Sequence, residues 1–442
     1  MAGKRNGGAG SGRVGTMIAL ALLGVVGAVS WVAGEVRLAK GATGPDVIVG
    51  VLPSVRYWGR TDEIAAFSIA TTSCNQGDRV LEWDRDTNRH PVIAQNMFRY
   101  SDGRFIQMGQ SWLKHGFFAL ARNACGLGCQ NPGDNQLLGI GCSDPYDANL
   151  NGDQSGLGPR FEVDASTGHF SYPFTGEFQT GDAIFKRLQV PVALLTEDLD
   201  ARFFIEGHYI APDDAEAGND LNNASYREVT VIENTATVPS SFQVLTEGST
   251  QQGAPAIQAW KDLDPLVQLE TVDVRDDGRY FVASKAVALG GGLWRYELAV
   301  HNLNSHRSAA SFSVSVPNGV SVTDIGFHRA AYHSGEPYAD GPWVSVRGAD
   351  DVAWGAEMLF ADGFESGLTG AWRVDLTTPT GDVSPPPDSG GSFADVSNAL
   401  RWGNLYNFWF TADRPPTAST ATLTLLRPGR PASVQVSVQG PS

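Results

Sequence analysis

The sequence predicts an all-β protein with two β-rich domains, which follow an N-terminal signal or anchor segment. Two features of composition and one of pattern predict this class. The chain has 51 glycines among 442 residues, and charged residues make up only 18% of it, against about 25% in a typical globular protein. Its apolar runs are short and bounded by Gly, Asn and Asp clusters, and a helical period is hard to find. Such punctuation is typical of antiparallel β-sheet.

The first 34 residues have the features of an export signal. Three basic residues and no acidic one precede an uncharged apolar stretch, Met17–Gly34, and this order is typical of exported proteins. Ala28–Ser30 offers a small-x-small cleavage site, yet the apolar stretch approaches the roughly 18 to 20 residues that span a bilayer. A cleaved signal peptide and an uncleaved membrane anchor therefore both stay open. In either case the rest of the chain lies outside the cytoplasm, so we expect a secreted or cell-envelope protein.

The cysteines agree with export. All four lie in one N-terminal third of the chain, at Cys74, Cys125, Cys129 and Cys142. An even, local set outside the cytoplasm predicts two disulfides, for which three connectivities are open. We expect Cys125–Cys129 together with Cys74–Cys142, because glycines in the short loop between Cys125 and Cys129 can absorb the strain of closure. The spacing contains no Cys-x-x-Cys knuckle and matches a zinc site poorly.

Residues 46–235 are expected to form the first β domain, which contains the disulfides. Proline in the stretch Leu188–Leu195 denies that segment a helix interior. The stretch Pro239–Gly253 is rich in Ser, Thr, Gln and Gly, and residues 236–264 around it are expected to link the two domains. The clearest strands of the first domain are Ile64–Ala70, Pro91–Phe98, Phe105–Met108 and Arg202–Ile210.

Residues 265–442 are expected to form the second domain, a β-sandwich. Its strands show period two, which places Trp294, Tyr296, Leu298 and Val300 on one face. The Pro/Gly-rich segment 377–392 is expected to be a loop within this sandwich, because the roughly 50 residues that follow are too few to bury a core alone.

The sandwich resembles the immunoglobulin-like domains of secreted bacterial proteins. In those domains an early strand of the Tyr-x-Tyr-x-Val-x-Asn type is completed by a late aromatic-rich strand. Trp294–Asn302 and Leu405–Asp413 carry the likeness here. The resemblance implies a fold and no chemistry.

A second resemblance rests on five short segments. The chain is similar in them to large secreted bacterial proteins that are known only as hypothetical, and the likeness covers most of residues 46–442. It implies export and a two-part architecture, and it supplies no catalytic residue. The segments are Thr72–Asn75, His90–Asn96, Ser111–Phe117, Gly141–Tyr146 and Asn398–Gly403.

The segment 144–153 is a candidate calcium loop. Oxygen side chains at alternate positions ahead of Gly152 resemble the start of a loop that wraps calcium, but the twelfth position is Gly158 and not Glu, so this is not an EF-hand. The alternative is an Asn/Asp turn whose side chains bond to its own backbone. No other cofactor is indicated. The candidate ligands are Asp147, Asn149, Asn151 and Asp153.

Some histidines lie near other ionisable residues and are candidates for metal or acid–base chemistry. His328 and His333 are separated by an odd number of residues, which would place them on opposite faces of a strand. The alternative for each is a hydrogen-bonded histidine in the fold. The settings are Lys114 with His115, His208 with Asp213 and Asp214, and the group Asp324, His328, His333 and Glu336.

Charge and motifs exclude several functions. A formal net charge of −16 leaves no basic stripe for nucleic acid. The chain contains no Gly-x-Ser-x-Gly, His-Glu-x-x-His, phosphate-binding glycine loop or Rossmann fingerprint. We therefore favour a non-enzymatic binding or structural protein of the cell surface or the extracellular space.

The candidate partners are a carbohydrate or another component of the cell envelope. The chain holds 11 Trp, 11 Tyr and 21 Phe, and aromatic rings on a rigid sheet stack on the apolar faces of sugars. The alternative is a secreted hydrolase that acts on a polysaccharide or another polymer with acids from the first domain. Exposed rings favour the binding protein, and two carboxylates across a cleft favour the enzyme.

Overall fold

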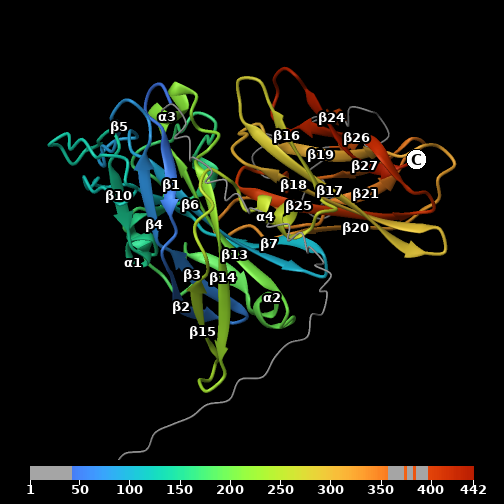
Figure 1. Cartoon of the computed structure of the whole chain (residues 1–442), viewed down its shortest axis with the longest axis horizontal. Helices are drawn as coiled ribbons and strands as arrows, with labels where there is room; N and C mark the ends of the chain where they lie inside the picture. The colour runs from blue at the N-terminus through green and yellow to red at the C-terminus, as the bar shows by residue number, and fades with distance from the viewer. Residues whose placement is uncertain (1–41, 357–372, 376–381, 385–396) are drawn as a thin grey trace, which may run out of the picture. The chain divides into compact units, whose positions relative to one another are not determined.

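A computed structural model describes residues 42–356, 373–375, 382–384 and 397–442 and confirms the all-β prediction, with 47% of residues in strands and 7% in helices (Figure 1). The export segment and most of the predicted loop 377–392 lie outside these ranges. Within the described ranges every strand pair of the main sheets is antiparallel. No helix in the part that the structure describes is long and apolar enough to cross a bilayer.

The first half of the chain is built on one large sheet and one small one. The large sheet has ten strands, and its outermost strands β15 and β2 come together, so the sheet nearly closes into a barrel. Along the sheet the order is β15 (Ser241–Thr246), β14 (Ala224–Asn234), β13 (Arg202–Ile210), β6 (Val92–Ser101), β7 (Arg104–Gln110), β12 (Leu188–Pro191), β3 (Ile64–Ile69) and β2 (Val55–Thr61), with β8 (Leu113–His115) pairing β6 and β11 (Leu157–Gly158). The small sheet is β1 (Val47–Val51), β4 (Thr71–Asn75) and β10 (Ser143–Tyr146), and a further pair is β5 (Leu81–Glu82) with β9 (Leu137–Leu138).

The second half is a sandwich of two five-stranded sheets around one core. The first sheet is β16 (Gln268–Asp273), β17 (Arg279–Gly290), β18 (Leu293–Asn302), β25 (Asn404–Ala412) and β20 (Val322–Arg329). The second is β21 (Val344–Arg347), β22 (Asp351–Gly355), β19 (Ala309–Ser315), β26 (Pro416–Leu425) and β27 (Ser433–Pro441). β23 (Arg373–Asp375) pairs with β24 (Asp382–Ser384). The late strand β25 pairs directly with the early strand β18, as the resemblance to immunoglobulin-like domains implies.

Helices are few and short, as expected from the scarcity of helical patterns. They are α1 (Ala148–Asn151), α2 (Val192–Thr196), α3 (Pro212–Ala217), α4 (Gln258–Leu263) and the 3-10 turns η1 (Gln154–Gly156) and η2 (Arg160–Glu162). Pro191 ends β12 and stands at the N-cap of α2, outside the helix interior, but the residues after it in the segment Leu188–Leu195 are helical, because a proline at the start of a helix blocks no hydrogen bond of the helix. The segment 236–264, expected as a linker, contributes β15 to the large sheet and α4, whose Trp260 is fully buried.

The two faces of β18 pack against different parts of the protein. Tyr296, Leu298 and Val300 enter the sandwich core, as the period-two pattern predicts. Ala299 and His301 on the opposite face are also buried, because the first half of the chain packs there. Ala299 belongs to an apolar cluster that includes Phe98 of β6 and Phe105 of β7. The two halves therefore share a core in addition to their own.

A buried arginine ties this junction together. Arg160 donates from Nε to the carbonyl oxygen of Ser111 at 2.7 Å and from Nη2 to the carbonyl oxygen of Gln95 at 3.0 Å and to Oδ1 of Asn96 at 2.9 Å. Its guanidinium also lies 5.5 Å from the ring of Trp402. The same cation thus fixes β6, the chain entering β8 and the segment before β25.

Gly403 is required by this packing. Its φ of +69° is unfavourable for a residue with a side chain, and a Cβ built there would lie 2.6 Å from Nη1 of Arg160. Its carbonyl oxygen accepts hydrogen bonds from the side chains of Asn96 and Gln107, both at 3.2 Å. Amide side chains of the large sheet therefore satisfy the backbone of the second half.

Two disulfides form, but the expected connectivity is wrong. The structure pairs Cys74 with Cys125 and Cys129 with Cys142. The glycines between Cys125 and Cys129 do not close a small ring. Gly126 and Gly128 adopt φ values of +70° and +82°, and the chain between them turns so that one cysteine reaches β4 and the other reaches the segment before β10. Two disulfides are compatible with an extracellular protein.

We expect non-reducing peptide mapping to recover the linked pairs Cys74–Cys125 and Cys129–Cys142. Replacing both cysteines of either pair with serine should lower the free energy of unfolding by about 2–4 kcal/mol, because each bridge restricts the unfolded chain. Urea titration of the two double variants measures the effect. Four free thiols, or a Cys125–Cys129 peptide, would contradict the structure.

Candidate functional site

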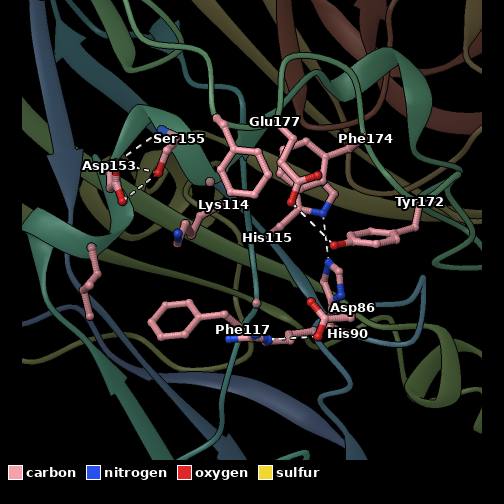
Figure 2. Close-up of a pocket in the computed structure, with 15 residues that line it drawn as sticks. Asp86, His90, Lys114, His115, Phe117, Asp153, Ser155, Tyr172, Phe174 and Glu177 are labelled. Atoms are coloured by element: carbon pink, nitrogen blue, oxygen red, sulfur yellow. Dashed lines mark hydrogen bonds and ion pairs between the residues drawn. The ribbon is translucent and has the colours of Figure 1, made fainter.

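The candidate site is a pocket of about 410 Å³ in the first half of the chain (Figure 2). Four stretches of sequence line it: the turn at 85–90, the end of β8 and the residues after it, the segment 150–156, and the segment 172–178. Its volume lies within the roughly 300–1,000 Å³ that is typical of small-molecule sites. Both aromatic side chains and ionisable groups line it.

Strand β8 brings Lys114 and His115 to the pocket. Its backbone pairs with β6 on one side, Val92 opposite His115, and with β11 on the other, Leu157 opposite Lys114. Both side chains are 4% exposed. Gly156 and Gly158 leave room for them, because a Cβ at Gly156 would lie 2.3 Å from Nζ of Lys114 and one at Gly158 would lie 2.6 Å from Nε2 of His115.

His115 forms a pair with His90. Nε2 of His90 lies 2.9 Å from Nδ1 of His115, and Nδ1 of His90 lies 3.2 Å from the carbonyl oxygen of Asp84. A carbonyl can only accept, so Nδ1 of His90 carries the hydrogen and its Nε2 is an acceptor. Nδ1 of His115 must then donate. Nε2 of His115 therefore carries a lone pair and has no hydrogen-bond partner among the described residues. The ring of His115 stacks on Phe174 at 3.7 Å between centroids.

Burial keeps both imidazoles neutral. It lowers the pKa of His90 to about 4 and the pKa of His115 well below its usual value, to which the neighbouring His90, Lys114 and Lys186 add repulsion. Because each folded-state pKa is depressed, the pair stabilises the fold fully above the ordinary histidine pKa of about 6.5. That stability is lost as the pH falls from there toward about 4.

We expect nitrogen-15 NMR of the two imidazoles to show neutral rings at pH 6, both with hydrogen on Nδ1. Exposed His169 serves as an internal reference, since it lies outside the pocket and faces solvent. A protonated His90 or His115 at pH 6, or hydrogen on Nε2 of either ring, would contradict the assignment.

Lys114 is a buried ammonium without a hydrogen-bond partner in the part of the chain that the structure describes. It lies 5.1 Å from the ring of Phe117, a cation–π contact. Burial lowers its pKa, and Asp153 opposes this only from beyond ion-pair distance. The nitrogen of Lys114 points into the pocket in Figure 2.

Lys186, which is also buried, is bonded quite differently. Its Nζ donates to the carbonyl oxygens of Gln154 at 2.9 Å, Gly176 at 2.5 Å and Gln179 at 3.0 Å. These acceptors belong to two pocket walls, the turn η1 and the segment that carries Glu177 and Phe178. Burial lowers the pKa of Lys186 to about 8. Lys186 therefore holds the pocket walls together, whereas the ammonium of Lys114 makes no hydrogen bond or ion pair within the described residues.

We expect Lys114→Met to raise the free energy of unfolding by about 1–2 kcal/mol, because it removes a buried charge that has no hydrogen bond or ion pair within the described residues. Lys186→Met should lower it by about 1–3 kcal/mol, because three carbonyl oxygens, one of them on the buried Gln154, lose their donor. Urea titration of both variants provides the comparison. Equal destabilisation by the two substitutions would show that Lys114 is also a structural lysine.

Aromatic rings form the rest of the pocket. Phe117, Tyr172 and Phe174 line it, and Phe178 stands at its edge with 78% of its surface exposed. The backbone N–H of Phe178 donates to the carbonyl oxygen of Ser155 at 2.8 Å, which joins the segment 172–178 to η1. An exposed ring held on a bonded backbone is a ready stacking surface.

The predicted calcium ligands lie beside the pocket, but each bonds to a different part of the protein. Asp147 caps α1 by accepting from the N–H of Leu150 at 2.8 Å. Asn149 accepts from Arg56, and Asn151 donates to the carbonyl oxygen of Ile69 and to Oγ1 of Thr71, each at 2.9 Å. Asp153 accepts from Ser155. Asp153 alone of the four lines the pocket. Calcium binding by these residues stays a prediction.

The structure does not bring the other histidine settings together. His333 bonds through Nε2 to the carbonyl oxygen of Arg187, and Glu336 accepts from the backbone N–H groups of Arg160 and Phe161. Asp324 forms an ion pair with Arg295. His328 lines another pocket, of about 350 Å³.

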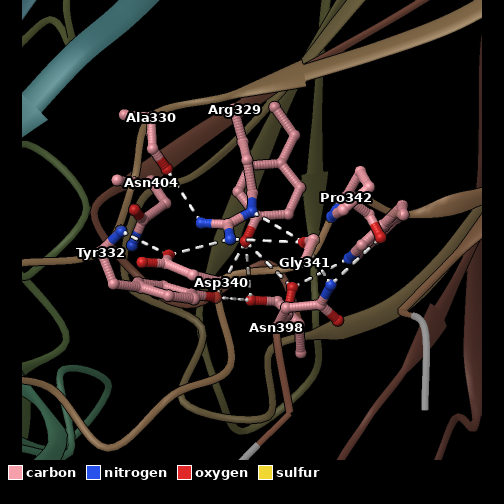
Figure 3. A network of polar contacts seen from close by, with 12 residues as sticks. Arg329, Ala330, Tyr332, Asp340, Gly341, Pro342, Asn398 and Asn404 are labelled. Carbon is pink, nitrogen blue, oxygen red and sulfur yellow. Dashed lines mark hydrogen bonds and ion pairs between the residues drawn. The ribbon is translucent and has the colours of Figure 1, made fainter. Parts of the chain in front are cut away.

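That second pocket is bordered by a polar network of the fold (Figure 3). Arg329 donates to Oδ1 of Asp340 at 2.9 Å and to the carbonyl oxygen of Gly341 at 3.3 Å, and Asn398 donates to the same carbonyl at 2.6 Å. The cation is therefore already paired. We therefore consider this pocket a weaker candidate for ligand binding than the first.

His208 and its two neighbouring acids are structural as well. Asp213 accepts from the N–H of Glu82 at 2.7 Å, and Asp214 accepts from the N–H of Val47 at 2.9 Å. His208 is fully buried at the junction, 6.3 Å from the ring of Trp402. Among the described residues, no group of three or more His, Cys, Asp or Glu side chains could hold a metal ion.

Comparison with known proteins gives no family for this chain. Neither a protein-family model nor a curated protein matches it. The sequence singled out Lys114 and His115, and it missed His90, Tyr172, Phe174 and Phe178 as members of the site. His90 and His115 do lie in two of the segments that carry the resemblance to hypothetical secreted proteins.

Proposed function

We propose that this is an exported protein of the cell surface or the extracellular space that binds a carbohydrate in the pocket around Lys114. The observation that carries the proposal is the combination of stacking rings with unpaired polar atoms in one pocket. Phe178 is exposed at its edge, while Nζ of Lys114 and Nε2 of His115 have no hydrogen-bond partner among the described residues.

This combination fits a sugar ring. A sugar has an apolar face that stacks on an aromatic ring and hydroxyl groups that need donors and acceptors. Lys114 supplies donors and the neutral His115 supplies an acceptor. The export segment and the two disulfides support a location where such polymers are met.

A hydrolase is the second candidate. Asp86, Asp153 and Glu177 line the same pocket, so carboxylates are present where a bound sugar would lie. Each already accepts a hydrogen bond, from Arg85, Ser155 and Tyr172 respectively. This arrangement favours binding over acid catalysis, and turnover of a bound polymer would favour the enzyme.

We expect the purified protein to bind saccharides on a glycan array and Phe178→Ala to weaken that binding about fivefold, the loss that corresponds to about 1 kcal/mol of stacking. Leu199→Ala is the matched control, because Leu199 is 97% exposed and does not line the pocket. Absence of any saccharide ligand, or equal binding by both variants, would overturn the proposed function. Release of shortened products from a bound polymer would replace it with the hydrolase.

A further inference from the structure

All but one of the charged side chains that line the pocket are paired within the described residues. Arg85 donates to Asp86 at 3.1 Å, Ser155 donates to Asp153 at 3.0 Å, and the hydroxyl of Tyr172 donates to Glu177 at 3.5 Å. His90 and His115 bond to one another. Of the charged side chains that line the pocket within the described residues, Lys114 alone has no hydrogen bond or ion pair.

Lys114 is also the most enclosed of these charges. It is 4% exposed, whereas 45% of the side chain of Arg85 and 66% of that of Asp86 are exposed. A buried ammonium is costly to the fold when it has no hydrogen bond or ion pair, and within the described residues Lys114 has only the more distant Asp153 and the ring of Phe117 to offset its charge. Lys186 shows that the same fold can satisfy a buried ammonium completely, with three carbonyl acceptors.

We infer that the ligand is an acidic saccharide whose carboxylate pairs with Lys114. This inference rests on the proposed function and names the class of sugar. A carboxylate carries one negative charge and matches a single ammonium, which is a point charge with three donors. Asp86, Asp153 and Glu177 surround the site and disfavour an anion of higher charge, such as a phosphate monoester. A uronic acid combines this carboxylate with the sugar face that Phe178 can stack on.

The test uses the whole exported protein and two probes, an oligogalacturonate and the same oligosaccharide after its carboxyl groups are reduced to alcohols. We expect the wild-type protein to bind the acidic probe at least tenfold more tightly than the reduced one in calorimetry. The preference should weaken as salt is added, because the pair is electrostatic. This comparison does not depend on any variant folding.

Three variants locate the effect. Lys114→Met should remove the preference for the acidic probe. Gly156→Ala should reduce it, because the new methyl group would occupy the position of the ammonium, 2.3 Å from Nζ. Lys261→Met is the control, since it changes the net charge equally at an exposed lysine outside the pocket.

The outcomes separate the inference from the proposed function. Equal binding of the acidic and the reduced probe, or a preference that survives Lys114→Met, would overturn the inference and leave carbohydrate binding standing. Tighter binding of a sulfated saccharide than of the uronate would also overturn it. Failure of every saccharide to bind would overturn both.

Discussion

The structure depends on one buried cation, the guanidinium of Arg160. Three of its hydrogen bonds hold the chain at Gln95, Asn96 and Ser111, and its face meets Trp402. Burial lowers its pKa to about 10, so the group is still charged at neutral pH. A buried charge tolerates little displacement of its acceptors, because each lost bond leaves an uncompensated charge in a medium of low dielectric constant. Arg160 therefore fixes the relative positions of β6, β8 and the entry to β25.

The pocket inherits its geometry from this arrangement. Ser111 lies three residues before Lys114, and Arg160 lies two residues after Gly158, which packs against His115. The walls are then joined by Lys186 and by the backbone bond between Phe178 and Ser155. Rigid support of this kind lets the pocket keep the ammonium of Lys114, which makes no hydrogen bond or ion pair within the described residues.

Much of the β structure was predictable, because alternation along a strand reports which face is buried. The strand around Tyr296 follows this rule as far as Leu298. The strands around Ile64 and Ile93 were recognisable as short apolar runs, and they are buried at nearly every position. The rule fails for Ala299 and His301, since their face of β18 is covered by the other half of the chain and not by solvent. No local pattern encodes that contact.

The site was only partly predictable for a related reason. Lys114 and His115 are adjacent in the sequence, but their partners come from turns and loops that have no period. The spacing of Asp147 and Asn151 predicts a metal loop, but it does not reveal that the same oxygen and amide groups cap a helix and bond to a neighbouring strand. The disulfide pairing depends on the direction of a glycine-rich turn, which composition does not give.

The position of Trp402 and Gly403 has a consequence for the order of assembly. These residues complete the surroundings of Arg160, yet they follow Gln95 by about three hundred positions in the chain. A chain that emerges in the N- to C-terminal direction during synthesis or translocation cannot complete the surroundings of Arg160 until Trp402 and Gly403 have emerged. Until β25 arrives, Arg160 lacks one face of its enclosure, and the strands that carry Lys114 and His115 lack their final anchor. Contacts of such long sequence separation form late and slowly. The pocket therefore reaches its final geometry only after the chain up to β25 has emerged, and a copy of the protein truncated before Trp402 would lack that support.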